Sequence, residues 1–215
     1  MKFLAIFLFS LSLFATNKFE ILTGDTRSLD DKLFWDKKYS DKTYIFGKIP
    51  ARFLSENFHY IPVGAHVLDV GMGEGRNAVF LARKGYRVTG VDISSVAVRK
   101  AQLLAKEVGV RIDGVTAPVE EYRPPKELFD AVICFYYVDR KINERLLSYL
   151  KPGGLLIYEA HTDLQKTIKG NEKYEHQYLL RSQELIGMFK KMRVLKYEEP
   201  LHQGEYTSSI ILKKE

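Results

Sequence analysis

The chain has 215 residues, a net charge of +6 and a pI of about 9.2. Its hydrophobic content of 46% and charged content of 28% are ordinary for one globular domain with a sizeable core. The lysines and arginines are scattered and often adjoin acidic residues, which favours a mixed solvated surface over a nucleic-acid-binding patch. The single cysteine, Cys134, excludes an intrachain disulfide and a cysteine-based zinc cluster. We therefore expect no nucleic-acid partner and no metal site.

The N-terminus begins with a basic residue and continues as an apolar run of about 13 residues, which is typical of a secretory signal peptide. The run is short for a membrane span, which needs about 20 apolar residues. Two alternatives stay open, an uncleaved membrane anchor and a misassigned start codon. We set residues 1–17 apart as a signal peptide or membrane anchor through which the chain could contact a membrane.

Residues 18–56 are predicted to be an N-terminal linker followed by an aromatic lid segment. The part from 18 to 31 is polar and irregular, and the following stretch is rich in aromatic side chains, among them Trp35 and Tyr39. Such a stretch can fold over a ligand as a lid or pack on the main domain as a helix, and the sequence leaves both open. The main domain is predicted to span residues 57–215.

The most informative stretch is Val67–Gly75, in which an apolar run is followed by Gly71, Gly73 and Gly75. The apolar run predicts a strand buried on both faces. Residues 76–84 predict a helix that ends before a glycine. Strand, glycine turn and helix together open a mononucleotide-binding βαβ unit, where glycine permits sharp turns and close approach of a ligand.

The spacing of these glycines narrows the choice of ligand. A dinucleotide-binding fold needs G-x-G-x-x-G, but here the third glycine comes one residue early and Arg76 stands in its place. A P-loop would need Gly-Lys-Ser/Thr, which is absent. Asp69, just before the turn, is a poor neighbour for a phosphate and a better one for a ligand with a cationic amine.

The next predicted strand, residues 86–93, has Asp92 near its end, about 20 residues after the first glycine. A carboxylate at this place can accept hydrogen bonds from both hydroxyl groups of a ribose. A helix from Ser94 or Ser95 and a third strand over residues 110–115 follow. The loop after the third strand is expected to lie over an adenine ring, with Val119 packing on it and Ala117 or Glu120 near its amine. A solvent-facing Glu120 is an equally good interpretation.

The second half of the chain predicts a fourth buried strand over residues 128–137, with Phe135 and Tyr136 at its end. A helix over 139–150, a Lys-Pro-Gly-Gly turn and a fifth strand over 155–160 come next. His161 follows that strand and is able to take a proton near neutral pH, although a lone histidine is more often structural. Ser182 can begin a helix through residue 191. Residues 192–198 and 208–213 are the predicted last two strands, paired antiparallel.

The run from Asp69 to Ala82, together with the next strand up to Asp92, resembles class I S-adenosylmethionine (SAM) methyltransferases. It is similar to the TehB-like and thiopurine-methyltransferase-like branch, as is the motif Trp35-Asp36-x-x-Tyr39. The resemblance implies an α/β, Rossmann-like fold with a seven-stranded sheet of order 3-2-1-4-5-7-6, strand 7 antiparallel, and helices on both faces. It implies that Asp69 and the glycine turn surround the methionine moiety.

These considerations give a set of candidate residues. The candidate SAM-binding residues are Trp35, Tyr39, Asp69, Gly71, Gly73, Gly75, Asn77, Asp92, Ile93, Val119, Glu120 and Phe135. The candidate catalytic residues, at the carboxyl ends of the fourth and fifth strands, are Tyr136 and His161. The aromatic faces of Trp35 or Tyr136 could also stabilise the sulfonium by cation–π contact.

The expected reaction is displacement at the sulfonium methyl by a small-molecule acceptor such as a thiol or a metalloid oxyanion. The end of the fourth strand lacks the Pro-Pro of enzymes that methylate amino groups of nucleobases or glutamine, which disfavours that activity. Two alternatives are a non-catalytic SAM-fold binding protein at the cell envelope and a protein or RNA methyltransferase. The leader suggests export or membrane attachment, whereas SAM dependence suggests cytoplasmic access. The sequence leaves the compartment and the oligomeric state open.

Overall fold

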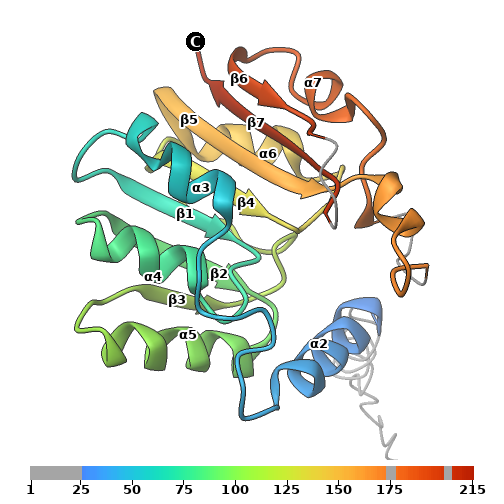
Figure 1. Cartoon of the computed structure of the whole chain (residues 1–215). Helices are drawn as coiled ribbons and strands as arrows, with labels where there is room; N and C mark the ends of the chain where they lie inside the picture. The colour runs from blue at the N-terminus through green and yellow to red at the C-terminus, as the bar shows by residue number, and fades with distance from the viewer. Residues whose placement is uncertain (1–25, 173–177, 201–204) are drawn as a thin grey trace, which may run out of the picture.

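The computed structural model describes residues 26–172, 178–200 and 205–215 (Figure 1). The predicted leader, residues 1–17, lies outside the described residues. Within those residues, no helix combines the length and the apolar character that crossing a membrane would require.

Seven strands form one sheet in the order β3-β2-β1-β4-β5-β7-β6, which confirms the predicted topology (Figure 1). The strands from β1 to β5 pair in parallel, and β7 runs antiparallel to both of its neighbours. Their bounds are β1 His66–Val70, β2 Arg87–Asp92, β3 Asp113–Thr116, β4 Phe129–Phe135, β5 Leu150–His161, β6 Arg193–Glu198 and β7 Thr207–Lys213.

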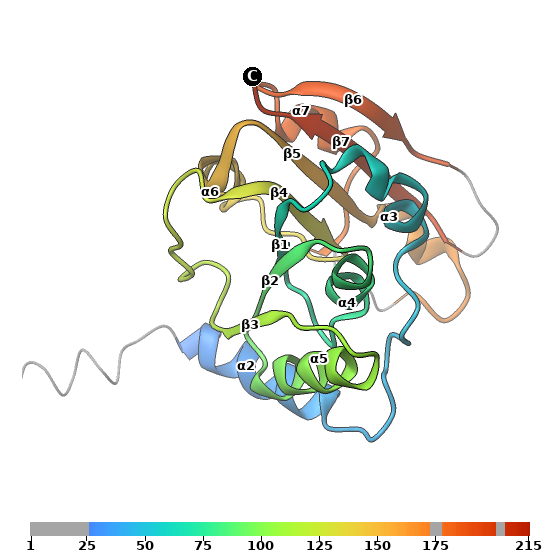
Figure 2. The same ribbon diagram turned by 90° about the vertical axis from the view of Figure 1, so that its left-hand side faces the viewer.

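Helices cover both faces of the sheet (Figure 2). Side chains of α3, α4 and α5 belong to the apolar cluster on one face, and those of α6 and α7 belong to the cluster on the other. Every residue of β1 is buried because this central strand is covered on both sides. The helix bounds are α2 Thr26–Tyr39, α3 Arg52–Asn57, α4 Arg76–Arg83, α5 Ser95–Glu107, α6 Asn143–Tyr149 and α7 Glu184–Met188.

The structure corrects several predicted boundaries. Residues 26–31, predicted to be a linker, belong to α2, a helix that contacts α5. The helix predicted from residue 139 begins only at Asn143, and α7 begins at Glu184, after Gln183 in the left-handed conformation. After β5, a 3-10 helix spans Asp163–Thr167.

The sheet order reverses between β1 and β4. From β1 the chain builds outward through β2 to β3 on one side, and it then returns to the centre and builds outward from β4 to β5 on the other side. In a doubly wound sheet, ligands bind outside the carboxyl ends of the strands at such a switch point. The glycine loop after β1, Asp92 at the end of β2 and Tyr136 after β4 all meet at this edge.

Candidate active site

The glycine loop connects β1 to α4 and is tied to the neighbouring strand. The backbone amides of Gly71 and Met72 donate to the carbonyl of Val91, at 2.9 and 3.1 Å. Gly73 and Gly75 have φ angles of +55° and +84°, in the left-handed region that favours glycine. A Cβ on Gly75 would lie only 2.6 Å from the Cβ of Ala101 on α5. This last glycine is therefore required for packing α5 against the loop, which is a structural reason rather than a ligand contact.

Asp92 links the end of β2 to the glycine loop. Its carboxylate accepts a hydrogen bond from the amide of Gly73 and another from the amide of Ser94, each at 2.8 Å. Burial raises the pKa of Asp92, and the two amide donors oppose that shift. An ionised carboxylate has about four lone-pair sites, so two remain for further donors such as ribose hydroxyls.

Asp69 lies at the base of the glycine loop and is 1% exposed. It accepts a hydrogen bond from the backbone of Ala78 in the first turn of α4, whereas its Oδ2 has no hydrogen-bond partner among the described residues. Burial, with a smaller contribution from Asp92, raises the pKa of Asp69 to about 8. Asp69, which was predicted to lie near a cationic amine, is therefore buried and bound to the start of α4. One of its two oxygens has no partner among the described residues, and the raised pKa makes the carboxyl group largely neutral at pH 7.

A cavity of about 270 Å³ lies beyond the carboxyl ends of β2 and β3, where Ile93 and Thr116 line it. It is lined by Ser28, Leu29, Lys32, Ile93, Thr116, Ala117, Pro118 and Glu121. Ile93 and Ala117 were predicted at this place, but Val119 and Glu120 do not line the cavity. Val119 is buried in the core on the α6 side and Glu120 is exposed, because the chain turns at this loop and presents their neighbours to the cavity instead.

The aromatic segment is a helix that lies over the glycine loop. Tyr39 at the end of α2 is 5% exposed, and its hydroxyl lies 3.0 Å from the position that a Cβ on Gly73 would take. The ring of Trp35 stacks on Tyr39 with a centroid distance of 5.5 Å. Asp36 accepts hydrogen bonds from the Ser94 hydroxyl at 2.6 Å and the Val96 amide at 3.2 Å. The helix thus packs on α5 while its last residue covers the glycine loop.

Two other predicted SAM-binding residues, Asn77 and Phe135, make contacts within the protein itself. The carboxamide oxygen of Asn77 accepts a hydrogen bond from the Ala51 amide at 2.9 Å, so this buried side chain secures the chain before α3. Phe135 is 6% exposed and belongs to the core on the α4 side. Tyr137, at the end of the predicted fourth strand, covers the loop, because its Cβ lies 3.0 Å from the Cβ position of Gly71.

The two predicted catalytic residues come together beyond the glycine loop. The rings of Tyr136 and His161 are 4.8 Å apart, and the Tyr136 hydroxyl donates to Glu205 at 3.0 Å. Tyr136 has a φ of +60°, a strained conformation that is often found at functional sites. Burial lowers the pKa of His161 and so favours the neutral imidazole.

The structure adds two carboxylates to this group. Glu159 is 4% exposed, and its Oε2 accepts a hydrogen bond from the Ser209 hydroxyl at 2.7 Å. Glu205 approaches from the start of the last strand and lies 4.0 Å from the Nδ1 of His161. No sequence pattern points to either carboxylate. Glu159 and Ser209, for example, become neighbours only through the antiparallel pairing of β5 and β7.

The rings of Trp35 and Tyr136, proposed to stabilise the sulfonium, each have a cationic side chain of this protein over one face. The ammonium of Lys38 lies 4.6 Å from the ring centroid of Trp35, and the guanidinium of Arg76 lies 5.2 Å from that of Tyr136. A sulfonium would have to displace these cations to use the same faces, so the structure does not support that role for either ring.

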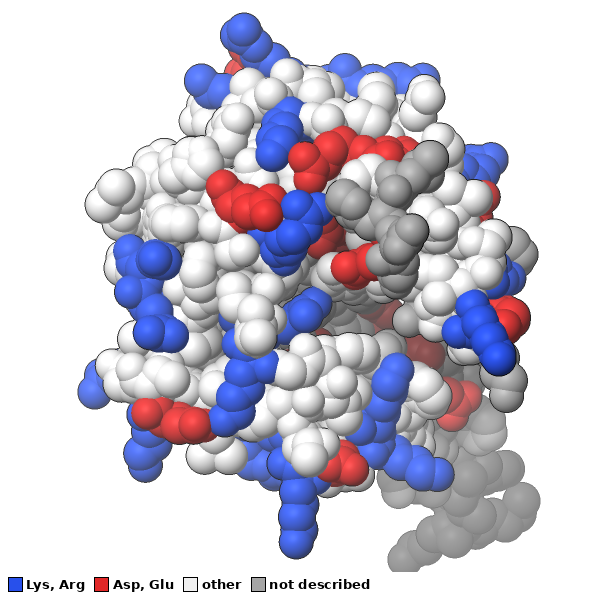
Figure 3. Space-filling model, in the orientation of Figure 1, with Lys and Arg blue, Asp and Glu red and all other residues white. Residues whose placement is uncertain are grey.

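Charged side chains around the site are mixed in sign. On the face shown in Figure 3, Lys and Arg side chains are interspersed with Asp and Glu side chains. In the described parts of the chain, no group of three or more His, Cys, Asp or Glu side chains could hold a metal ion.

Residues 67–154 match the family model of a methyltransferase domain. This segment runs from β1 through the first part of β5 and contains the glycine loop and Asp92. The strand order around it is that of the Rossmann-like methyltransferase fold.

The chain is similar to the ubiquinone biosynthesis O-methyltransferase of Rickettsia canadensis, with 32% identity over 114 residues, which cover 50% of this chain and 48% of that protein. The chain thus spans about half the length of the curated relatives it matches.

Two solved structures share the fold. A SAM-dependent methyltransferase from Aquifex aeolicus has a TM-score of 0.62 and 16% identity, covering 82% of this chain and 95% of that chain. TehB from Haemophilus influenzae has a TM-score of 0.63 and 18% identity, covering 86% of this chain and 67% of that chain.

Proposed function

We propose that this protein transfers the methyl group of SAM to a small-molecule acceptor. The observation that carries the proposal is the geometry around Asp92. This carboxylate binds the amide of Gly73 in the glycine loop, and Ile93, the next residue in the chain, lines a cavity of about 270 Å³, as expected for a ribose flanked by a methionine moiety and an adenine ring. The matching methyltransferase domain model supports the same cofactor.

The finer assignment concerns the acceptor. The relative from Rickettsia canadensis is named an O-methyltransferase, which supports an acceptor hydroxyl, whereas TehB shares only the fold at 18% identity. A neutral hydroxyl must lose its proton when it attacks the methyl group, and the neutral imidazole of His161 is suited to accept it. The carboxylate of Glu205, near both His161 and Tyr136, makes the acceptor side a poor place for a metalloid oxyanion.

In this mechanism the protein mainly positions the reactants, because methyl transfer from a sulfonium releases a neutral thioether, which is an excellent leaving group. Asp92 would hold the ribose, and the unused oxygen of Asp69 would face the polar end of the methionine moiety. The acceptor would lie against Tyr136 and His161, beyond the glycine loop. When bound, SAM would supply its methyl group to the acceptor oxygen, with S-adenosylhomocysteine as the leaving group, and His161 would take the proton of the acceptor hydroxyl.

Calorimetric titration with SAM and with NAD tests the cofactor, and transfer of a labelled methyl group to a panel of phenols, other hydroxyl compounds and thiols tests the acceptor. We expect SAM to bind, NAD to be ignored and hydroxyl compounds to be methylated. Binding of NAD without SAM would refute the cofactor assignment. Binding of SAM without methylation of any acceptor would favour a non-catalytic SAM-binding protein.

A further inference from the structure

The side chain of Lys100 on α5 joins the end of α2 to the glycine loop. Its ammonium donates hydrogen bonds to the carbonyl oxygens of Tyr39, Asp41 and Thr43, at 3.3, 2.9 and 2.6 Å. The same ammonium forms an ion pair with Glu74 of the glycine loop, whose side chain is 3% exposed. One cation thus binds the segment after α2 and a buried carboxylate of the site at the same time.

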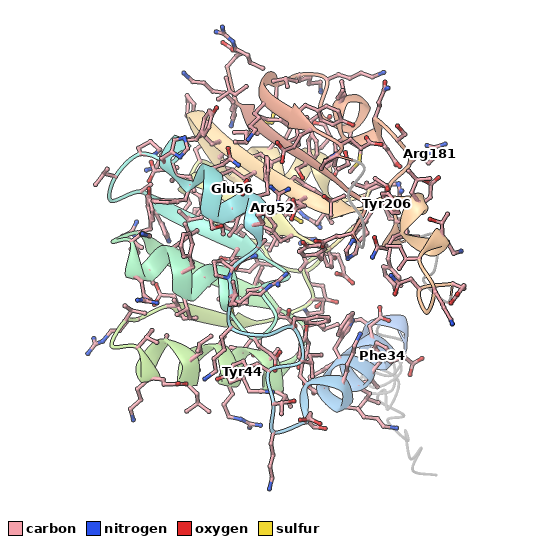
Figure 4. All side chains as sticks on the ribbon, viewed as in Figure 1. Phe34, Tyr44, Arg52, Glu56, Arg181 and Tyr206 are labelled. Atoms are coloured by element: carbon pink, nitrogen blue, oxygen red, sulfur yellow. The ribbon has the colours of Figure 1, made fainter. Side chains whose placement is uncertain are left out.

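Tyr44, labelled in Figure 4, makes two further contacts with Lys100. Its hydroxyl donates to the carbonyl of Lys100 at 3.1 Å, and its ring centroid lies 5.0 Å from the Lys100 ammonium. At the other end of the segment, Asp36 accepts hydrogen bonds from Ser94 and Val96 in the first turn of α5. The helix α5 therefore fixes residues 36–44 at both ends.

These contacts determine where Tyr39 lies. Lys100 binds the carbonyl of Tyr39, and the hydroxyl of the same residue lies 3.0 Å from the Cβ position of Gly73. Trp35 stacks on the Tyr39 ring and follows its position. Without Lys100, the carbonyls from 39 to 43 would lose their shared donor, and the buried carboxylate of Glu74 would lose its counter-charge.

We propose that Lys100 is a positioning residue for the cofactor, which holds Tyr39 and Trp35 over the glycine loop so that they form one wall of the SAM site. The inference rests on the proposed function, since the cofactor is SAM only under that proposal. Lys100 acts through the residues that it positions, because its ammonium is directed to Glu74 and to backbone carbonyls rather than into the cavity.

The first test is Lys100→Met, which removes the donors and keeps much of the side-chain length. We expect the dissociation constant for SAM, measured by calorimetry, to rise about tenfold or more, the size expected for lost hydrogen bonds to a charged group. We expect kcat at saturating SAM to change less than KM. The matched control is Lys106→Met, on the same helix with an exposed side chain, which should leave both values unchanged. Equal SAM affinity in Lys100→Met and the control would overturn the proposal.

A second variant separates positioning from simple neutralisation of a buried charge. The double variant Glu74→Gln/Lys100→Met removes the unpaired carboxylate and should recover thermal stability relative to Lys100→Met alone. It should not recover SAM affinity, because the carbonyls of residues 39–43 still lack their donor. Recovery of SAM affinity together with stability would show that Lys100 only compensates Glu74, and would refute the positioning role.

A third measurement does not depend on the cofactor. Trp35 is the only tryptophan of the chain, so its fluorescence reports on this segment alone. In the absence of SAM, acrylamide should quench Trp35 more strongly in Lys100→Met than in wild type or Lys106→Met. Equal quenching in all three proteins would refute the positioning role. Absence of SAM binding by wild type would refute the proposed function, and the quenching comparison would still decide whether Lys100 holds the segment.

Discussion

The two halves of the candidate site are built in different ways. On the cofactor side, the main chain of residues 71–75 and the carboxylates of Asp69 and Asp92 come from two adjacent strands and the turn between them. On the acceptor side, Tyr136, His161 and Glu205 come from separate segments of the second half of the chain. The first half depends on local conformation, and the second depends on how distant strands pair.

This difference predicts how each half responds to change. Substitutions in the glycine loop should affect folding as well as binding, because the loop is also the contact between β1, α4 and α5. Substitutions on the acceptor side should affect turnover with little effect on the fold, because Glu205 is exposed and His161 lies at the end of its strand.

The largest expected effect is on stability, from Gly75→Ala. The new Cβ would lie 2.6 Å from the Cβ of Ala101 at a φ of +84°. We expect the free energy of unfolding in urea to fall by about 2–5 kcal/mol, from backbone strain and overpacking together. The matched control is Gly85→Ala, where φ is +88° but no atom lies within 4 Å of the new Cβ. That variant should lose about 1–2 kcal/mol from strain alone. Equal losses would show that the α4–α5 contact tolerates a methyl group.

The next effect is on turnover, from His161→Gln. We expect kcat for methylation of a hydroxyl acceptor to fall about 100-fold, because the proton acceptor is lost, with unchanged SAM affinity. Burial lowers the pKa of His161 from its ordinary value of 6.5, so wild-type kcat/KM should fall only as the pH drops below about 6.5. This acid limb should be absent in the variant. Full activity with an unchanged pH profile would remove His161 from the mechanism.

A smaller effect is expected on SAM affinity from Asp92→Ala. Loss of hydrogen bonds between the carboxylate and the ribose should weaken binding by about 1–3 kcal/mol in a calorimetric titration. The matched control is Asp113→Ala, an exposed carboxylate at the start of β3, which should leave the affinity unchanged. If both variants bind SAM as wild type does, the ribose assignment is wrong.

A separate effect is the contribution of Asp69 to the pH dependence of stability. Its pKa is about 8 in the folded protein against an ordinary value of 3.8, so the unfolded chain binds fewer protons between these values. The stability of wild type should therefore fall as the pH rises from about 4 to about 8. Asp69→Asn should remove this component, so the difference in Tm between variant and wild type should favour the variant more at pH 8 than at pH 5. A pH-independent difference would contradict the shifted pKa.

The local sequence was sufficient to place the cofactor side. The glycine spacing and the acid at the end of the next strand specify a strand, a left-handed turn and a carboxylate within a short stretch, so neighbouring residues carry the information. The order of the sheet followed from the resemblance of this stretch to methyltransferases. The same local reasoning did not predict the surroundings of Asn77 and Val119, and it left a solvent-facing Glu120 open; contact of these three residues with SAM stays a prediction. These residues have the expected sequence positions, but the packing around them directs their side chains to Ala51, to the core and to solvent.

The sequence by itself determined the fold class, the glycine loop and the two carboxylates beside it, because these depend on backbone conformation within a few residues. Only the tertiary structure decided which side chains surround Tyr136 and His161, that Glu159 lies opposite Ser209, and that Lys100 binds both the glycine loop and the segment after α2. These contacts join residues that are far apart in the chain. Strand register and helix packing bring them together, and neither can be read from the spacing of residues along the sequence.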